Sequence, residues 1–301
     1  MADRHLPDNP DLDQYRRQAK DLRKALGAGD PVALDRLKRF HPRGASTGAA
    51  KLADAQLVLA REHGFASWPA FAAEVGAREA AGWPVTVACD AGKLRVDVSD
   101  GSNAKSVVLF VLAGNVGSQH RGIRQIADRL RRAGHATVLA DLLTPEEALQ
   151  DALDEELCFD VRLLGERAGL ILDRIVADPA LSPLPLALFC AGTGGAAGAQ
   201  LAALRREAVR ATVSVAARPD LAGSALARVR APSLFVVGGE DPVAHGFTRT
   251  MLQIFPRDVA HRLEVVRGIG PRFEEGPAAA RAAELAIDWL DSHLQRAEHG
   301  A

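Results

Sequence analysis

The sequence predicts a doubly wound, mostly parallel α/β sheet that follows an all-helical module. Apolar residues in the first eighty positions recur at helical spacing, and after Pro84 the spacing changes to the alternation of a β-strand. From Ser106 onward, strand-like and helix-like segments alternate, which is typical of parallel strands joined by helical crossovers. We therefore expect a helical module over residues 1–80 and an α/β domain over residues 81–301.

The helical module is expected to contain four helices. Asn9-Pro10 and Asp30-Pro31 each place a capping residue before a proline at the first helical position, and Ser67 caps a helix that begins at Trp68. The remaining helix is the leucine- and alanine-rich stretch over residues 52–60. A bundle of this size buries little apolar surface, so we expect it to depend on a neighbour for stability.

The α/β domain is expected to begin with a hairpin and to continue as buried strands. The turn Asp90-Ala91-Gly92 separates two alternating segments, and the apolar run over residues 107–112 is typical of a strand buried on both faces. Ligands of such sheets bind beyond the carboxyl ends of the strands, where we expect the functional residues. Further strands are predicted at residues 136–141, 186–189, 211–215, 233–237 and 263–266, and helices at 122–133 and 277–294.

Composition narrows the classes of function. The 301 residues include 37 Lys and Arg against 38 Asp and Glu, and this balance argues against a nucleic-acid partner. The first residues lack the apolar core of a secretory signal, and the glycines and prolines of the uncharged stretch 179–204 fit a strand and a turn better than a membrane span. The three cysteines have no metal-ligand spacing. We expect a cytoplasmic protein without a metal or cofactor.

Four segments of the expected α/β domain carry a family resemblance: Asp141–Glu147, Arg218–Gly223, Arg230–Asp241 and Phe273–Glu275. Through them the chain resembles the α/β-hydrolase superfamily, in its dienelactone-hydrolase-like branch. The resemblance implies an α/β-hydrolase-type sheet with a nucleophile on a sharp strand-to-helix turn, a base and an acid. The first eighty residues resemble a helical module that precedes ankyrin repeats in bacterial proteins, and we infer no function from that similarity.

The same resemblance implies that two of the three triad residues are replaced. The family's turn reads small-x-nucleophile-x-Gly, which places the nucleophile at Gly192. Pro271 takes the place of the family's histidine, whereas the acid, Asp241, is present. The loop after the first central strand has Ala113-Gly114 where relatives often carry His-Gly. We therefore do not expect hydrolysis through an acyl-enzyme.

Several groups at the functional edge can still act on a ligand. The N–H groups of Thr193 and of Gly114-Asn115, at a helix N-terminus, favour negative charge, although Thr193 is also a plausible helix cap. His120 is the best remaining candidate for proton transfer, against the alternative of a solvated helix cap, and Asp141 is expected to organise its loop. We expect a substrate site lined by Ala113, Gly114, Asn115, Cys190, Gly192, Thr193, His245 and Pro271, with His120 and Asp241 as catalytic residues.

Three functions fit these residues. The first is a cofactor-independent oxygenase, or a related lyase or isomerase, that acts in biosynthesis on a small aromatic or polyketide-like molecule. The second is a catalytically inactive pseudo-hydrolase that serves as a ligand-binding or scaffold protein. The third is a hydrolase that uses Cys190, which requires the turn to shift by two residues. All three leave the identity of the small molecule open, and a homo-oligomer is compatible with each.

Overall fold

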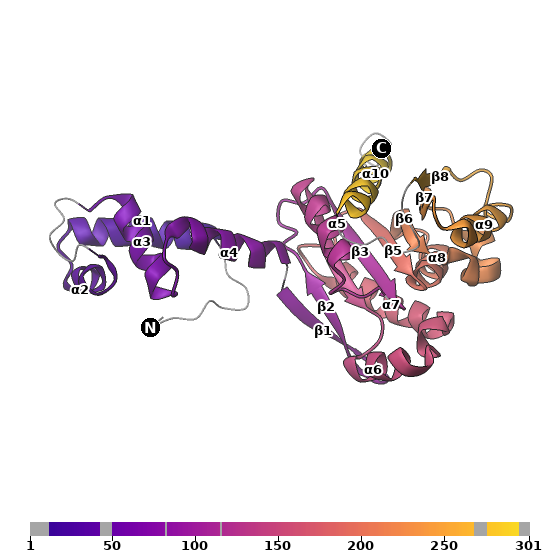
Figure 1. The fold of residues 1–301 in the computed structure, drawn as a ribbon, viewed down its shortest axis with the longest axis horizontal. Coiled ribbons are helices and arrows are strands. Elements are labelled where there is room, and N and C mark those ends of the chain that lie inside the picture. The colour runs from indigo at the N-terminus through magenta and orange to yellow at the C-terminus, as the bar shows by residue number, and fades with distance from the viewer. Residues whose placement is uncertain (1–11, 43–49, 82, 115, 268–275, 295–301) are drawn as a thin grey trace. The chain divides into compact units, whose positions relative to one another are not determined.

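The computed structural model describes residues 12–42, 50–81, 83–114, 116–267 and 276–294 (Figure 1). The chain divides into two compact units, Met1–Trp83 and Pro84–Ala301, and each is described by itself. Among the described residues, no helix has the length and apolar character needed to cross a bilayer.

The first unit is helical, and its helices begin where the sequence places capping residues. The Asp30 carboxylate accepts a hydrogen bond from the Ala33 N–H at 2.8 Å, and the Ser67 hydroxyl accepts one from the Ala70 N–H. Both predicted caps are therefore confirmed, whereas Asn9-Pro10 lies outside the described residues. The described helices are α1 (Leu12–Gly27), α2 (Pro31–Phe40), α3 (Leu52–Glu62) and α4 (Trp68–Ala81).

The second unit contains an eight-stranded sheet in the order β1-β2-β4-β3-β5-β6-β7-β8 (Figure 1). Strand β2 pairs with β4 antiparallel, and the pairs from β4 through β3 to β8 are parallel, which confirms the predicted doubly wound sheet. The strands are β1 (Trp83–Cys89), β2 (Gly92–Val98), β3 (Ser106–Ala113), β4 (His135–Asp141), β5 (Leu186–Gly192), β6 (Val209–Ala217), β7 (Ser233–Gly238) and β8 (His261–Val266).

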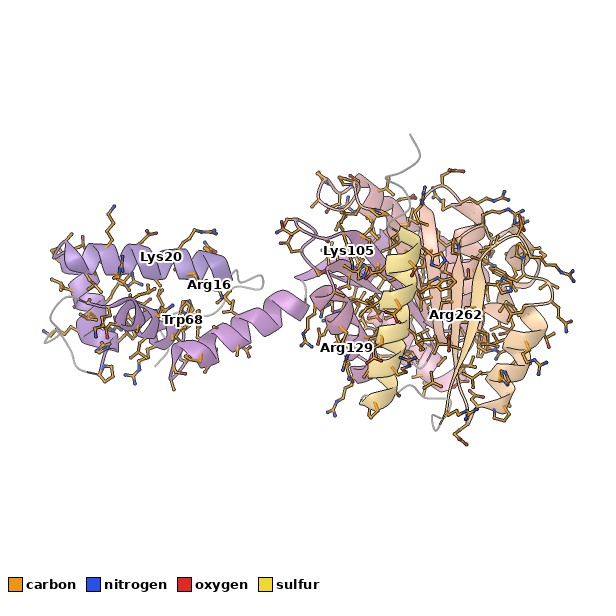
Figure 2. The ribbon with its side chains drawn as sticks, turned by 90° about the horizontal axis from the view of Figure 1, so that it is seen from above. Arg16, Lys20, Trp68, Lys105, Arg129 and Arg262 are labelled. Atoms are coloured by element: carbon orange, nitrogen blue, oxygen red, sulfur yellow. The ribbon has the colours of Figure 1, made fainter. Side chains whose placement is uncertain are left out.

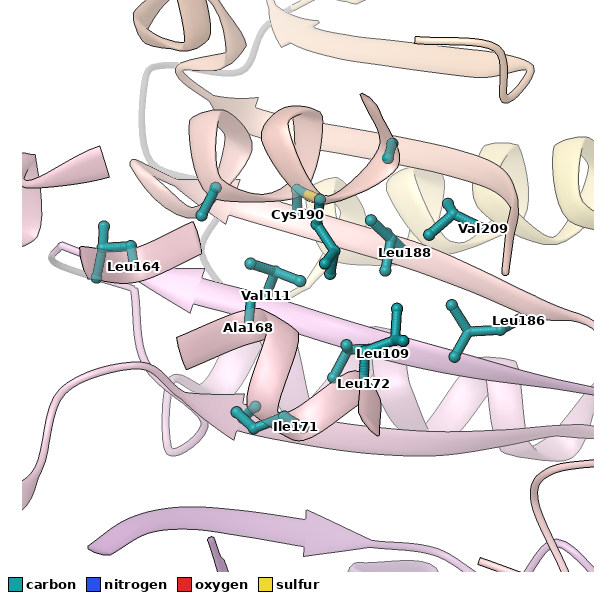
Figure 3. Packing of buried hydrophobic residues seen from close by; sticks show 14 of the residues in the cluster. Leu109, Val111, Leu164, Ala168, Ile171, Leu172, Leu186, Leu188, Cys190 and Val209 are labelled. Atoms are coloured by element: carbon teal, nitrogen blue, oxygen red, sulfur yellow. The ribbon is translucent and has the colours of Figure 1, made fainter. Parts of the chain in front are cut away.

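Helices cover both faces of this sheet because its central strands are apolar on both sides. Alternate residues of β3 pack against different helices, with Leu109 and Val111 in one core and Val108 and Phe110 in the other. Helices α7 (Val161–Ala177) and α8 (Gly194–Leu204) contribute to the first core, which Figure 3 shows, and α5 (Arg121–Arg132) and α10 (Pro277–Leu294) to the second. The second unit also contains α6 (Pro145–Asp154), α9 (Pro242–Met251) and the 3-10 helices η1 (Leu157–Phe159) and η2 (Pro219–Arg228).

Glycines allow α8 to lie unusually close to the strands beneath it. A Cβ on Gly194 would lie 2.2 Å from the carbonyl oxygen of Val111, and a Cβ on Gly198 would lie 2.3 Å from the Cys190 sulfur. Such distances are far below van der Waals contact, so only glycine fits at either position without a shift of its neighbours. The helix that follows β5 is thereby fixed against the sheet at its amino end.

A buried arginine holds the segment that follows β4. The Arg167 side chain on α7 is 2% exposed and donates to both carboxylate oxygens of Glu147, at 2.6 and 2.7 Å, and to the carbonyl of Leu142. Glu147 also accepts from the Thr144 N–H in the cap of α6. These bonds hold the segment Asp141–Glu147 against the core at the carboxyl edge of the sheet.

Candidate functional site

The sharp turn between β5 and α8 has the backbone of a nucleophile elbow, with a glycine at its tip. Gly192 has φ +59°, a left-handed conformation that favours glycine, and its carbonyl accepts a hydrogen bond from the Arg218 N–H at 2.9 Å. Strand β5 pairs with β3 so that Gly192 lies beside Ala113. The turn therefore brings the expected positions Ala113, Gly114, Gly192 and Thr193 together at the carboxyl edge.

The space that a side chain at position 192 would need is occupied by backbone. A Cβ on Gly192 would lie 2.2 Å from the carbonyl oxygen of Ala113 and 3.9 Å from the Cβ of Val116. Real Cβ atoms do not approach an oxygen so closely, so a serine or cysteine could stand here only if the end of β3 moved. In this arrangement position 192 cannot carry a nucleophile.

Thr193 is the polar side chain at the amino end of α8. Thr193 is 6% exposed. Its hydroxyl makes no capping bond and has no hydrogen-bond partner among the described residues. A Cβ on Gly114, which has φ +79°, would lie 3.5 Å from this hydroxyl oxygen. The hydroxyl therefore faces the loop that follows β3. Thr193 occupies the N-cap position of α8, as the alternative expected, but its side chain makes no capping hydrogen bond.

The loop between β3 and α5 is held by Asp141 at the end of β4. Its two carboxylate oxygens accept hydrogen bonds from the N–H and the hydroxyl of Ser118, each at 2.6 Å. The expected loop-organising role of Asp141 is therefore confirmed. His120 stands at the cap position of α5, but its side chain makes no capping bond, and its Nδ1 is buried without a partner in the described part of the chain.

The acid of the family resemblance is engaged in the local structure of α9. The Asp241 carboxylate accepts a hydrogen bond from the Ala244 N–H at 3.0 Å and so caps the helix. His245 follows in the first turn, where its N–H donates to the Asp241 carbonyl. Asn115 and Pro271, the other two expected site residues, lie outside the described residues.

Cys190 does not meet the requirements of a nucleophile or of a ligand contact. The residue is 1% exposed, and its sulfur lies against Gly198 of α8. Burial raises the pKa of the thiol to about 12, so the reactive thiolate is not populated near neutral pH. The buried position of the side chain therefore gives no support to a Cys190-dependent hydrolase.

One side chain at this edge was not singled out as a site residue from the sequence. Arg218, whose N–H holds the Gly192 carbonyl, donates to both carboxylate oxygens of Asp220 at 2.9 and 2.8 Å. Its guanidinium also lies over the Phe247 ring of α9, 4.4 Å from the centroid, and the hydrogen bond to Asp220 raises its pKa. The sequence signal was the family-like run Arg218–Gly223, to which no role had been assigned.

No cluster of three or more potential metal ligands occurs within the ranges that the structure describes. Gly192 and Thr193 lie together at the amino end of α8. Among the described residues, no proton acceptor is hydrogen-bonded to the Thr193 hydroxyl. Chemically, this arrangement can donate hydrogen bonds to an oxygen atom that carries negative charge.

Solved structures identify the relatives of this fold. A dienelactone hydrolase from Anabaena variabilis is 35% identical with a TM-score of 0.66, and the match covers 70% of this chain and 97% of that protein. The chain belongs to the dienelactone hydrolase family. The predicted branch of the α/β-hydrolase fold is thereby confirmed.

More distant structures share the fold alone. Est1E from Butyrivibrio proteoclasticus is 12% identical, with a TM-score of 0.55 over 69% of this chain and 99% of that protein. A serine hydrolase homologue from Coxiella burnetii is 14% identical, with a TM-score of 0.55 over 68% of this chain and 95% of that protein. No protein-family model matches the sequence.

Two curated relatives from Mycobacterium tuberculosis strains are provisionally named phosphoribosyl transferases. Each is 39% identical over 188 residues, which is 62% of this chain. The chain spans 41% of the length of these relatives, so more than half of each lies outside the match.

Proposed function

We propose that this member of the dienelactone hydrolase family does not hydrolyse esters and instead binds a small molecule through an anionic or carbonyl oxygen at the amino end of α8. The observation that carries the proposal is the Ala113 carbonyl, which occupies the place of a side chain at position 192. Without a nucleophile, no acyl-enzyme forms, but the donors that would stabilise an oxyanion are retained.

The orphan hydroxyl of Thr193 supports the binding part of this proposal. A buried hydroxyl without a partner costs free energy unless a ligand or solvent satisfies it. It stands at the first turn of an eleven-residue helix, where free N–H groups and the helix dipole favour an anion. A carboxylate or a phosphate would satisfy all three features.

The names of different relatives suggest two classes of ligand that carry such an oxygen. The family name suggests a carboxylate or lactone, whereas the name of the Mycobacterium tuberculosis relatives suggests a phosphorylated sugar. More than half of those relatives lies outside the match, so the activity in their name is not assigned to the matched part. The residues here support recognition of an anion and no transfer step.

An ester-hydrolysis assay and a binding assay test the proposal. Wild-type protein is incubated with p-nitrophenyl acetate and p-nitrophenyl butyrate, and we expect no hydrolysis above background. Calorimetric titration with benzoate and with ribose 5-phosphate is expected to show binding of at least one of them. Thr193→Val, which keeps the shape and removes the hydroxyl, is expected to weaken that binding at least fivefold, or about 1 kcal/mol.

Thr250→Val provides the matched control, because Thr250 is exposed on α9 and its hydroxyl donates to the Gly246 carbonyl. This variant is expected to bind as the wild type does. Ester turnover by the wild type would overturn the non-hydrolytic part of the proposal. Equal binding by the wild type and Thr193→Val, or no binding of either probe, would overturn the anion site.

The cofactor-independent oxygenase is a second candidate, favoured by the buried, unpartnered Nδ1 of His120. An imidazole with a free ring nitrogen can remove a proton from an electron-rich phenol, whose anion then reacts with oxygen. Oxygen consumption with a panel of hydroxylated aromatics tests this, and His120→Gln is expected to abolish it. Identical products with and without oxygen exclude the oxygenase.

A further inference from the structure

A hollow lies at the opposite edge of the sheet, where the parallel strands begin. Its volume is about 910 Å³, which is within the range of small-molecule sites. Ser106, His135 and Leu186, the first residues of β3, β4 and β5, line it, together with Asp291 from α10. This edge is separated from the Gly192 turn by the length of the strands, so the hollow is a site distinct from the one proposed above.

One end of this hollow is a polar cluster. Ser106 Oγ and His135 Nδ1 are 2.7 Å apart, and Asp291 Oδ1 lies 3.4 Å from His135 Nε2 and 2.5 Å from Lys105 Nζ. Figure 2 shows Lys105 beside α10, the helix that carries Asp291. His135 is 3% exposed, and its Nε2 has no hydrogen-bond partner among the described residues.

The protonation of His135 follows from these contacts. Burial, reinforced by the positive charge of Lys105, lowers the pKa of the imidazole to about 4, so the ring is neutral near pH 7. Because the Ser106 hydroxyl can donate to Nδ1, and because the carboxylate of Asp291 faces the other side, the ring proton is placed on Nε2. The cluster therefore presents an unused donor, Nε2–H, beside a carboxylate acceptor.

Most of the remaining lining is apolar, although Ser182, Glu207 and Arg210 also line the hollow. Side chains from α7 and from the segment before β5 form its walls, and Val176 among them remains 55% exposed. An exposed apolar wall gains free energy when a ligand removes it from water, at roughly 25 cal/mol per Å². The wall residues include Ile175, Val176, Leu181, Pro183, Leu184 and Leu186.

We propose that this hollow binds an uncharged alcohol or phenol with an apolar body, whose hydroxyl accepts from His135 Nε2 and donates to Asp291 Oδ1. A hydroxyl is both donor and acceptor, so it satisfies the two groups at once. The charge of a ligand carboxylate would be repelled by the Asp291 carboxylate. A ligand ammonium would compete with Lys105 for Asp291 Oδ1. The charge of Asp291 is already balanced by Lys105, so an uncharged ligand leaves the cluster neutral.

The test uses three probes that differ at one group: 1-naphthol, naphthalene and 1-naphthoate. Equilibrium dialysis against the full chain is expected to show 1-naphthol bound at least fivefold more tightly than either of the others. Asp291→Ala, which removes the acceptor, is expected to lower the affinity for 1-naphthol at least fivefold. Val176→Glu, which places a charge on the apolar wall, is expected to lower it at least tenfold.

Matched controls separate these effects from altered folding. Asp288→Ala changes an exposed aspartate of the same helix α10, and Leu170→Glu changes a 41%-exposed residue of the same helix α7, and neither lines the hollow. Both controls are expected to bind 1-naphthol as the wild type does, and all four variants are checked for an unchanged circular dichroism spectrum. Equal affinity for the three probes, no binding of 1-naphthol, or unaltered binding by Asp291→Ala and Val176→Glu would each overturn the proposal.

Discussion

The carbonyl oxygen of Ala113 and the α-carbon of Gly192 lie so close that a Cβ on the glycine would be 2.2 Å from the oxygen. The two residues belong to neighbouring parallel strands and pair directly in the sheet. Their contact closes the position over the turn from β5 to α8. The backbone of this turn therefore leaves no room for a side chain at position 192.

Reintroduction of a serine at the turn is expected to fail. Gly192→Ser combines the strain of a left-handed non-glycine residue with the overlap against Ala113, and we expect a loss of at least about 2 kcal/mol in the free energy of unfolding. No ester hydrolysis is expected. Urea denaturation and an ester assay measure both effects.

The same substitution in open space provides the control. A Cβ on Gly246 of α9 meets nothing within 4 Å, so Gly246→Ser is expected to change the free energy of unfolding by no more than about 0.5 kcal/mol. If Gly192→Ser is as stable as Gly246→Ser, or hydrolyses esters, the closed turn described here is incorrect.

The contact between Cys190 and Gly198 predicts a coupled pair of substitutions. Gly198→Ala would place a methyl group 2.3 Å from the sulfur, and we expect a loss of about 1–3 kcal/mol in stability. In a Cys190→Ala background the sulfur is absent, so the same change is expected to cost at least about 1 kcal/mol less. A double-mutant cycle by urea denaturation measures the coupling, and additive losses would contradict it.

The Arg167–Glu147 pair predicts a dependence of stability on acid. Hydrogen bonds from Arg167 lower the pKa of the Glu147 carboxyl below its ordinary value of 4.5, so its stabilising contribution is present above pH 4.5 and is lost as the pH falls below it. Glu147→Gln leaves the buried guanidinium with only the exposed carboxylate of Asp90, 3.3 Å away, as a counter-charge, and we expect a loss of about 3 kcal/mol at pH 7.

Urea denaturation at pH 7 and at pH 3.5 tests this expectation, because the difference between the wild type and Glu147→Gln should shrink at the lower pH. Glu166→Gln provides the matched control, since Glu166 pairs with Arg162 on the exposed surface of α7. Its effect is expected to stay within about 0.5 kcal/mol. A Glu147→Gln effect as small as that of Glu166→Gln would show that the buried pair does not hold the loop.

His135 predicts a second pH dependence in a different range. Its folded pKa of about 4 lies below the value near 6.5 of an unfolded histidine, so the unfolded chain binds more protons between these values. The stabilising contribution of the neutral ring is complete above pH 6.5 and is lost as the pH falls toward 4. NMR titration of the imidazole should give a midpoint near 4, whereas a midpoint near 6.5 would contradict the burial.

Much of the fold could be predicted from the sequence because its local signals agree with its tertiary packing. Asp30 and Ser67 mark helix starts that the structure confirms, and the apolar run from Val107 to Leu112 is a strand buried on both faces. The spacing of apolar residues and the identity of capping residues are local properties, so they can be read from one sequence. Close packing of α8 on the sheet was not predicted, because the contact between Gly198 and Cys190 depends on the three-dimensional register of two elements.

The site could be predicted only in part, for the same reason. The position of the turn at Gly192 and the loop-organising role of Asp141 followed from the resemblance and from the strand ends. The overlap with the Ala113 carbonyl, the orphan state of the Thr193 hydroxyl and the stacking of Arg218 on Phe247 did not, because each depends on atoms brought together by different strands and helices. The cluster of Ser106, His135 and Asp291 was not predicted, because its residues come from three elements far apart in the sequence.

The close contact between β3 and the β5–α8 turn also bears on which substitutions this chain tolerates. A substitution of Gly192 by serine would add a hydroxyl that has no room, because the end of β3 would first have to move away. Intermediate sequences would carry the destabilisation without any gain in chemistry. New capabilities of this chain are therefore more readily acquired at other surfaces than by adding a side chain at position 192.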